Sequence, residues 1–245
     1  EPNNLDFMAE LSKVYMEDGQ STRAMDLLES ATTLDDSRAD LWYLLSQANR
    51  HANRLQHALV CAEKACSMDT GAVQPLLLCG EISLQMGNPD LALEFAQKAL
   101  ASQPANEAAV LFQVKVFEWN DKPEEGLNLL EKSITPDSSV MMVLAYTRLV
   151  FKQRGAQAAL PMLKKIAETD PDEVGVLNLL ARAQEECGEV SGAEQTAYQA
   201  LQLQPNQPDM NLLMGRLKRR EGQLDQSVHY LSEAIRQEPG AMDAY

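Results

Sequence analysis

The sequence predicts an all-α solenoid, a stack of antiparallel helix pairs with about 14 helices, and three observations support this. Small residues recur at intervals of 34, 34, 34, 33, 34 and 34 residues, at Ala24, Ala58, Ala92, Gly126, Ala159, Ala193 and Ser227. Apolar residues make up 45% of the 245 residues but aromatic residues only 5%, which favours closely packed helices over sheets. A turn residue recurs in the same register, at Gly19, Asn53, Gly87, Asp121, Gly155, Gly188 and Gly222. One structural unit repeated along the chain accounts for all three observations.

The repeats are expected to form a single array over residues 1–245. They lie near 5–38, 39–72, 73–106, 107–139, 140–173, 174–207 and 208–241, and residues 242–245 begin a further repeat. Tyr245 stands where Trp42 stands in the second repeat, so we expect the chain to be a fragment of a longer protein. Neither end carries a polar capping helix, and the uncapped ends are expected to allow self-association.

The first helix of each repeat is predicted from apolar and small residues at i, i+3, i+4 and i+7, which form one buried stripe. The stripe comprises Met8, Leu11, Ser12 and Tyr15 in the first repeat, Trp42, Leu45, Ser46 and Asn49 in the second, Leu76, Cys79, Gly80 and Ser83 in the third, and Leu177, Leu180, Ala181 and Gln184 in the sixth.

The second helix of each repeat carries small residues at fixed positions, which let two helix axes approach closely. These sets are Ala24/Leu28/Ala31, Ala58/Ala62/Ala65, Ala92/Ala96/Ala99 and Ala193/Ala197/Ala200. Pro89 and Pro123 are expected to start second helices, where a missing N–H costs little. A further group of prolines is expected to stop second helices, namely Pro104, Pro171, Pro205 and Pro239.

The middle of the chain is expected to be irregular. The single interval of 33 residues lies between Gly126 and Ala159, and Thr135, Pro136 and Asp137 close the fourth repeat early. Pro161 falls inside the second helix of the fifth repeat, where the lost hydrogen bond costs about 3 kcal/mol if unrelieved. A local kink or an altered crossing angle is predicted there.

These motifs resemble those of the tetratricopeptide repeat family. The order W-x2-L-[GAS]-x2-Y, then A-x3-[FYLA]-x2-A, then P, is matched for example by Trp42, Leu45, Ser46, Ala58 and Ala62. The resemblance covers essentially the whole chain. It implies a right-handed α/α superhelix in which the first helices line a concave groove and the second helices form the convex back.

The groove is the first candidate binding surface. On each first helix, the residue after the Trp42-type position and the residue four further on share one face. The predicted groove residues are Tyr43, Gln47, Leu77, Leu111, Lys115, Leu144, Arg148, Asn178, Arg182, Leu212 and Arg216. Four of them form a basic ladder, Lys115, Arg148, Arg182 and Arg216, on a chain with a net charge of −15.

Two interpretations of the ladder remain open. Apolar anchors with guanidinium donors would suit an acidic peptide. Alternatively, the basic residues are solvated or pair with Glu118, Glu185 and Glu186. Some members of the family bind acidic C-termini through a clamp of Lys and Asn, but Lys13 and Lys115 stand where Asn would be expected. The resemblance therefore does not extend to that clamp.

Two other clusters have ordinary structural explanations. Arg216, Lys218, Arg219 and Arg220 could bind an anion, although basic residues also favour the last turn of a helix. His57, Cys61, Cys66 and Cys79 could suggest a metal, but no CxxC motif occurs, and small packing residues explain the cysteines better.

Several function classes are excluded by the sequence. A net charge of −15 argues against nucleic acid as a partner. We expect no signal peptide and no membrane insertion from the residues of this chain, so a cytoplasmic location is the default expectation. No phosphate-binding loop or nucleophile motif is present, so no enzyme activity and no cofactor are predicted.

The predicted function is a protein-protein interaction scaffold that binds a protein or peptide in the groove. The basic ladder favours an acidic partner. The alternative is a substrate-recruiting or secretion-assembly region of a larger protein whose catalytic or membrane domain lies outside this fragment.

Overall fold

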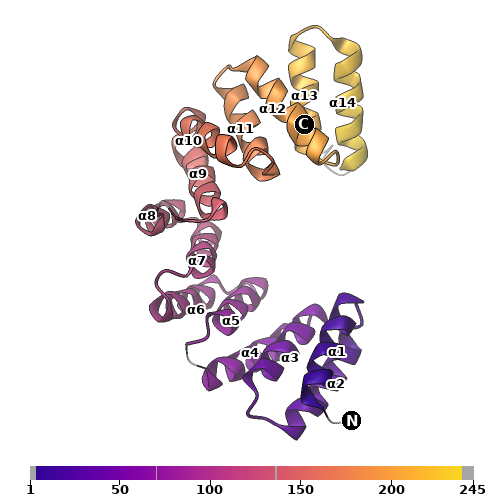
Figure 1. Cartoon of the computed structure of the whole chain (residues 1–245), viewed down its shortest axis with the longest axis vertical. Coiled ribbons are helices and arrows are strands. Elements are labelled where there is room, and N and C mark those ends of the chain that lie inside the picture. The colour runs from indigo at the N-terminus through magenta and orange to yellow at the C-terminus, as the bar shows by residue number, and fades with distance from the viewer. Residues whose placement is uncertain (1–3, 70, 136, 239–245) are drawn as a thin grey trace. The chain divides into compact units, whose positions relative to one another are not determined.

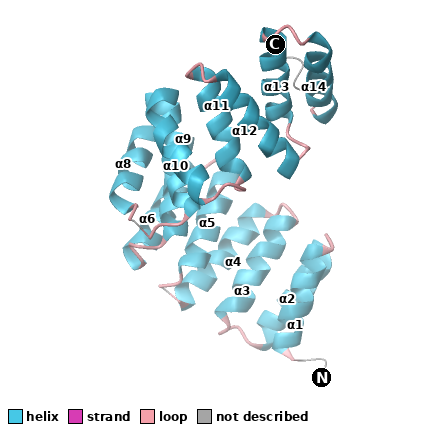
Figure 2. Ribbon diagram, turned by 45° about the horizontal axis from the view of Figure 1, so that its top comes forward, coloured by secondary structure: helices cyan, strands magenta, loops and turns pink. Residues whose placement is uncertain are grey.

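A computed structural model describes residues 4–69, 71–135 and 137–238 and contains 14 α-helices and no strand in these ranges (Figures 1 and 2). The all-α solenoid prediction is confirmed. The helices are α1 (Leu5–Glu17), α2 (Ser21–Leu34), α3 (Ala39–His51), α4 (Leu55–Met68), α5 (Val73–Gln85), α6 (Pro89–Ser102), α7 (Glu107–Trp119), α8 (Pro123–Ser133), α9 (Val140–Arg154), α10 (Ala156–Thr169), α11 (Val174–Glu186), α12 (Val190–Leu203), α13 (Pro208–Arg220) and α14 (Leu224–Gln237).

The helices form two compact units, Glu1–Ser133 with α1 to α8 and Ile134–Tyr245 with α9 to α14. Within each unit a helix packs against the next one along the chain, for example α3 on α4 and α13 on α14. First helices also contact first helices, as α1 with α3 and α5 with α7. The odd-numbered helices start where the repeats were predicted to start, which is consistent with the proposed division into repeats. The predicted eighth repeat lies outside the described residues.

Most first helices end in the same left-handed turn. Gly19 has φ +72°, and its neighbour Gln20 donates its backbone N–H to the Tyr15 carbonyl at 2.7 Å. Asn53 and Asp121 adopt φ of 57° and 56° at the equivalent turns, which these two residue types tolerate better than most. The seven predicted turn residues all have positive φ. The turn signal in the sequence is therefore confirmed.

Most residues of the predicted stripes are buried, Tyr15 and Trp42 are half-buried, and one residue is exposed. The small residues of the second helices, including Ala24, Ala58, Ala92 and Ala193, are fully buried. Leu11, which was predicted to be buried, is 43% exposed. Its equivalent Leu45 is buried because α2 packs against α3, whereas no described helix precedes α1. Position within the array overrides the periodic pattern there.

The irregularity lies where the 33-residue interval predicts it. α8 has 11 residues, fewer than the 14 of α6, and it ends at Ser133 before the early closing segment. α9 extends to 15 residues, and Gly155 alone, with φ +85°, connects it to α10. α10 runs without a break through Pro161, and the predicted kink stays a prediction. Pro136 and Pro239 lie outside the described residues.

Candidate functional site

A groove of about 500 Å³ opens in the first unit along α3, α5 and α7. Its lining includes the five groove residues predicted for this part of the chain, Tyr43, Gln47, Leu77, Leu111 and Lys115. The other lining residues are Arg50, Gln74, Leu78, Glu81, Ala108 and Phe112. Whether a ligand binds at these residues stays a prediction.

The helical repeat explains how these side chains come together. Tyr43, Leu77 and Leu111 are spaced by 34 residues, so each occupies the same position on its own first helix. Gln47 and Lys115 lie four residues further along α3 and α7, one turn away on the same face. Three parallel first helices therefore present corresponding positions side by side.

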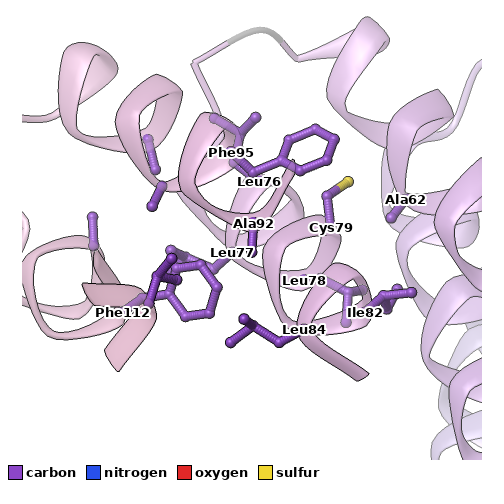
Figure 3. Packing of buried hydrophobic residues seen from close by; sticks show 14 of the residues in the cluster. Ala62, Leu76, Leu77, Leu78, Cys79, Ile82, Leu84, Ala92, Phe95 and Phe112 are labelled. Carbon is purple, nitrogen blue, oxygen red and sulfur yellow. The ribbon is translucent and has the colours of Figure 1, made fainter. Parts of the chain in front are cut away.

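The floor of the groove is apolar. Leu77, Leu78 and Phe112 are buried in the hydrophobic cluster that also holds Leu84 and Ala92 (Figure 3). Phe112 approaches α5 at Gly80, where an added Cβ would lie only 2.4 Å from a ring carbon. The glycine thus permits a close contact between α5 and α7, and this contact closes the base of the groove.

The rim of the groove is polar. Arg50 and Glu81 form an ion pair that connects α3 to α5. The Gln47 amide Nε2 donates to the Tyr43 hydroxyl at 3.2 Å. Burial raises the pKa of Tyr43, and the nearby Glu81 carboxylate adds to the shift. The phenol therefore stays neutral at physiological pH and can donate a hydrogen bond.

Lys115 adds a second positive charge to the rim. Its side chain is exposed, and it makes no ion pair with any residue in the described ranges. The charged lining residues are therefore Arg50, Lys115 and Glu81, with one positive charge in excess. A local excess of positive charge is unusual on a chain of net charge −15 and favours an anionic group on a ligand.

The remaining predicted groove residues lie on α9, α11 and α13 of the second unit: Leu144, Arg148, Asn178, Arg182, Leu212 and Arg216. The Arg182 guanidinium lies 5.7 Å from the Phe151 ring centroid, a cation–π contact. Arg216 contacts Glu185 at 3.1 Å, one of the pairings that the alternative interpretation expected. Asn178 donates to Gln207 at 2.6 Å, and its own Oδ1 is buried with no partner in the described part of the chain.

The ladder is therefore not a row of uniformly solvated cations. Arg216 is paired, and Arg182 covers an aromatic ring. The four ladder residues are divided between the two compact units, because Lys115 belongs to the first unit and the three arginines to the second. A continuous basic surface across the four residues stays a prediction.

The basic cluster at the end of α13 is matched by carboxylates. Lys218 is buried and hydrogen-bonds to Glu194 and, at 3.2 Å, to Glu221. The hydrogen bond to Glu194 raises the pKa of Lys218, with Glu221 adding to the shift. Arg220 lies 3.9 Å from Glu185. These contacts support the structural explanation over an anion site.

The cysteines show one arrangement that sequence reasoning missed. The Cys66 and Cys79 sulfurs lie 3.8 Å apart, although the two residues belong to different helices. Among the described residues no three His, Cys, Asp or Glu side chains converge as metal ligands. The available signal was the register, because Cys66 and Cys79 occupy positions where the second helix of one repeat faces the first helix of the next.

Sequence reasoning also missed part of the groove lining, notably Arg50, Gln74 and Phe112. Arg50 lies three residues beyond Gln47, so the i, i+3 relationship could have identified it. Phe112 was harder to predict, because its place depends on the missing side chain of Gly80.

Two family models described as tetratricopeptide repeat match residues 10–69 and 151–217, together just over half of the chain. The chain belongs to the tetratricopeptide repeat family. No curated protein sequence matches it. Proteins with this fold are typically non-catalytic interaction scaffolds.

Solved structures agree on the fold. A tetratricopeptide repeat protein from Parabacteroides merdae ATCC 43184 is 15% identical with a TM-score of 0.72, and the match covers 96% of this chain and 93% of that one. Pseudomonas aeruginosa pilF is 18% identical with a TM-score of 0.70, and the match covers 85% of this chain and 95% of that one. The APC/C hetero-tetramer Cut9-Hcn1 is 14% identical with a TM-score of 0.70, and the match covers 98% of this chain and 48% of that one. At these identities the likeness concerns the fold alone.

None of the helices in the described ranges is both long and apolar enough to cross a bilayer.

Proposed function

We propose that this interaction scaffold holds a peptide or a partner helix in the groove along α3, α5 and α7. The observation that carries the proposal is the hollow of about 500 Å³ lined by equivalent positions of three successive first helices. Such a surface offers apolar contacts at a regular spacing, as an extended or helical peptide requires. Leu77, Leu111 and Phe112 supply the apolar contacts.

The ligand is expected to be acidic as well as apolar. Lys115 has no carboxylate partner among the described residues, and Arg50 has only Glu81. A carboxylate of the ligand near Lys115 would complete the charge balance of the rim, and charge-assisted hydrogen bonds are stronger than neutral ones. The Tyr43 hydroxyl and the Gln74 amide provide further polar contacts.

A peptide-display selection tests this proposal. Peptides enriched on the wild-type protein are expected to combine acidic and large apolar residues. Binding of an enriched peptide, measured by fluorescence anisotropy, should weaken at least about tenfold in Lys115→Glu, which corresponds to about 1.4 kcal/mol.

Lys98→Glu is the matched control, because Lys98 is an exposed lysine of the same unit that lines a different hollow. It should leave the affinity unchanged. Equal losses in the two variants, or enrichment of basic peptides, would contradict the proposal. The double variant Arg148→Glu/Arg182→Glu changes only the second unit, so a peptide held along α3, α5 and α7 should keep its affinity within about threefold.

We propose end-to-end self-association as a second role, supported by the exposure of apolar side chains at repeat positions that are elsewhere buried. Phe7 and Val14 on α1 are 67% and 57% exposed, whereas their equivalents Leu41 and Ala48 are fully buried. On α14, Val228 is 64% exposed, whereas its equivalent Met25 is buried. α14 of one copy could therefore cover α1 of a second copy as α2 covers α3.

Sedimentation velocity over a range of protein concentrations tests this role. Wild-type protein is expected to form concentration-dependent oligomers, and added salt should strengthen them by screening the net charge of −15. Phe7→Asp/Val14→Asp should remain monomeric. Met86→Asp replaces an exposed apolar residue away from both surfaces and should behave as wild type. A wild-type protein that stays monomeric at all concentrations would exclude the role.

A further inference from the structure

Two thiols from neighbouring repeats meet at the interface of α4 and α5. Cys66 lies in the last turn of α4, and Cys79 lies in the middle of α5. Their sulfurs are 3.8 Å apart and form a thiol–thiol hydrogen bond. Both are free cysteines in this structure. A disulfide requires a bond of about 2.05 Å, so the sulfurs must approach by only about 2 Å.

The two thiols differ in their access to solvent. Cys79 is fully buried in the hydrophobic cluster beside Ala62, Leu76 and Phe95 (Figure 3). Cys66 is partly exposed and lines a pocket of about 810 Å³ formed by α4, α5 and α6. A small oxidant can therefore reach Cys66 from solvent, whereas the fully buried Cys79 has no surface in contact with solvent.

The electrostatic surroundings also separate the two thiols. The hydrogen bond with Cys79 lowers the pKa of Cys66 below its ordinary value, and Lys98 also lowers it, whereas burial and Glu63 act in the opposite direction. The same hydrogen bond and burial raise the pKa of Cys79. Cys66 is thus the thiol that ionises first, and Cys79 is the one that keeps its proton. A thiolate, not a thiol, is the reactive nucleophile.

We propose that Cys66 and Cys79 form a peroxide-sensitive modification site, in which Cys66 is oxidised first and Cys79 resolves it to a disulfide. The Cys66 thiolate attacks one oxygen of hydrogen peroxide, the O–O bond breaks, and Cys66 becomes a sulfenic acid while hydroxide leaves. As the Cys79 proton passes to the sulfenic oxygen of Cys66, the Cys79 sulfur attacks the Cys66 sulfur, the S–O bond breaks, and water leaves. One peroxide is reduced to two waters, and the dithiol is oxidised by two electrons.

The other two cysteines provide internal comparisons. Cys61 is buried, and burial raises its pKa to about 11, so it should react slowly. Cys187 is partly exposed like Cys66 but makes no hydrogen bond to a second thiol in the described ranges. Neither residue combines access to solvent with a second thiol in hydrogen-bond contact, as the proposal requires.

Thiol counting after treatment with hydrogen peroxide tests the proposal. The full chain has four cysteines, and two free thiols are expected after oxidation, with loss of two hydrogen atoms from the intact monomer mass. Peptide mapping should recover a Cys66–Cys79 cross-link. Before oxidation, Cys66 should react with iodoacetamide faster than Cys187, its matched control of partial exposure.

Variants assign the two steps. In Cys79→Ala the sulfenic acid on Cys66 should persist and be trapped by dimedone, whereas Cys66→Ser should protect Cys79 from oxidation. Circular dichroism verifies that both variants keep their helices. Cys187→Ala should form the cross-link as wild type does. The proposal is overturned if oxidised wild type keeps four thiols, if Cys66 proceeds to sulfinic acid without a cross-link, or if Cys187 reacts as fast as Cys66.

Discussion

Gly80 controls how closely the helices at the base of the groove approach. An added Cβ would lie 2.4 Å and 2.6 Å from two ring carbons of Phe112, far inside van der Waals contact. Phe112 is itself buried, so its ring has little room to move. The residue type at position 80 therefore bears on both the stability of the third repeat and the shape of the groove.

Gly80→Ala is expected to destabilise the protein. Overpacking costs about 1–3 kcal/mol, and the higher helix propensity of alanine offsets about 1 kcal/mol of that loss. Chemical denaturation monitored by circular dichroism measures the difference. In the double variant Gly80→Ala/Phe112→Leu, the smaller side chain should relieve the contact, so the two effects should be less than additive. Strict additivity would show that the Phe112 contact is not the cause.

Arg38 shows how the charge of a single residue contributes to stability. It contacts Asp6 on α1 at 3.0 Å and Asp40 on α3 at 2.7 Å, so it connects the first two repeats. The hydrogen bond from Arg38 holds the pKa of Asp40 below its ordinary value. Both carboxylates are mostly exposed, which limits the energy of the contacts.

Arg38→Gln should lower the free energy of unfolding by about 0.5–1 kcal/mol at neutral pH. A depressed folded-state pKa stabilises the fold above the unfolded aspartate value of about 4, and the contribution disappears as the pH falls through the folded value. The difference in the free energy of unfolding between wild type and Arg38→Gln should therefore shrink as the pH falls from 7 into the acid range. Arg23→Gln is the control, because Arg23 donates to the Gln20 amide oxygen rather than to a carboxylate. If the difference in the free energy of unfolding persists at acid pH, the lost stability comes from packing and not from the ion pairs.

At the scale of helices, the sequence predicted the turns and helix ends that recur with the repeat, and it missed burial and contacts that depend on adjacent helices. Turn residues such as Gly19 and Asn53 need a particular φ, so their residue type alone reveals the turn. The early end of α8 followed from the same reasoning. The prediction that Leu11 is buried was wrong, because burial requires a covering helix and a periodic pattern does not show whether one is present. The Cys66–Cys79 contact was missed because it depends on how two repeats stack.

The small residues of the second helices set the distance between helices within a repeat. Ala92 is fully buried on α6, whereas Ala101 on the same helix is exposed. Ala92→Leu should destabilise the protein by about 1–3 kcal/mol, because the added atoms have no space in a packed core. Ala101→Leu should change stability by less than about 0.5 kcal/mol. Thermal denaturation compares the two, and similar losses would contradict the assignment of Ala92 as a spacing residue.

At the scale of the whole molecule, stability should be local. In solenoids each repeat contacts only its neighbours, so the free energy of folding is close to a sum of repeat and interface contributions. The cluster around Leu28 and Leu45 and the cluster around Leu76 and Phe112 both lie within the first unit. The groove along α3, α5 and α7 belongs to this unit as well.

We therefore expect residues 1–133 to fold alone and to bind the selected peptide with an affinity within about threefold of the full chain, a difference of about 0.7 kcal/mol or less. The matched control is residues 1–106, which lack α7 and with it Leu111, Phe112 and Lys115. This shorter fragment should remain helical, since the contacts of α1 to α6 with one another are intact, but it should lose the peptide. Equal binding by both fragments would place the ligand elsewhere on the first unit, and failure of residues 1–133 to fold would show that its cores depend on the second unit.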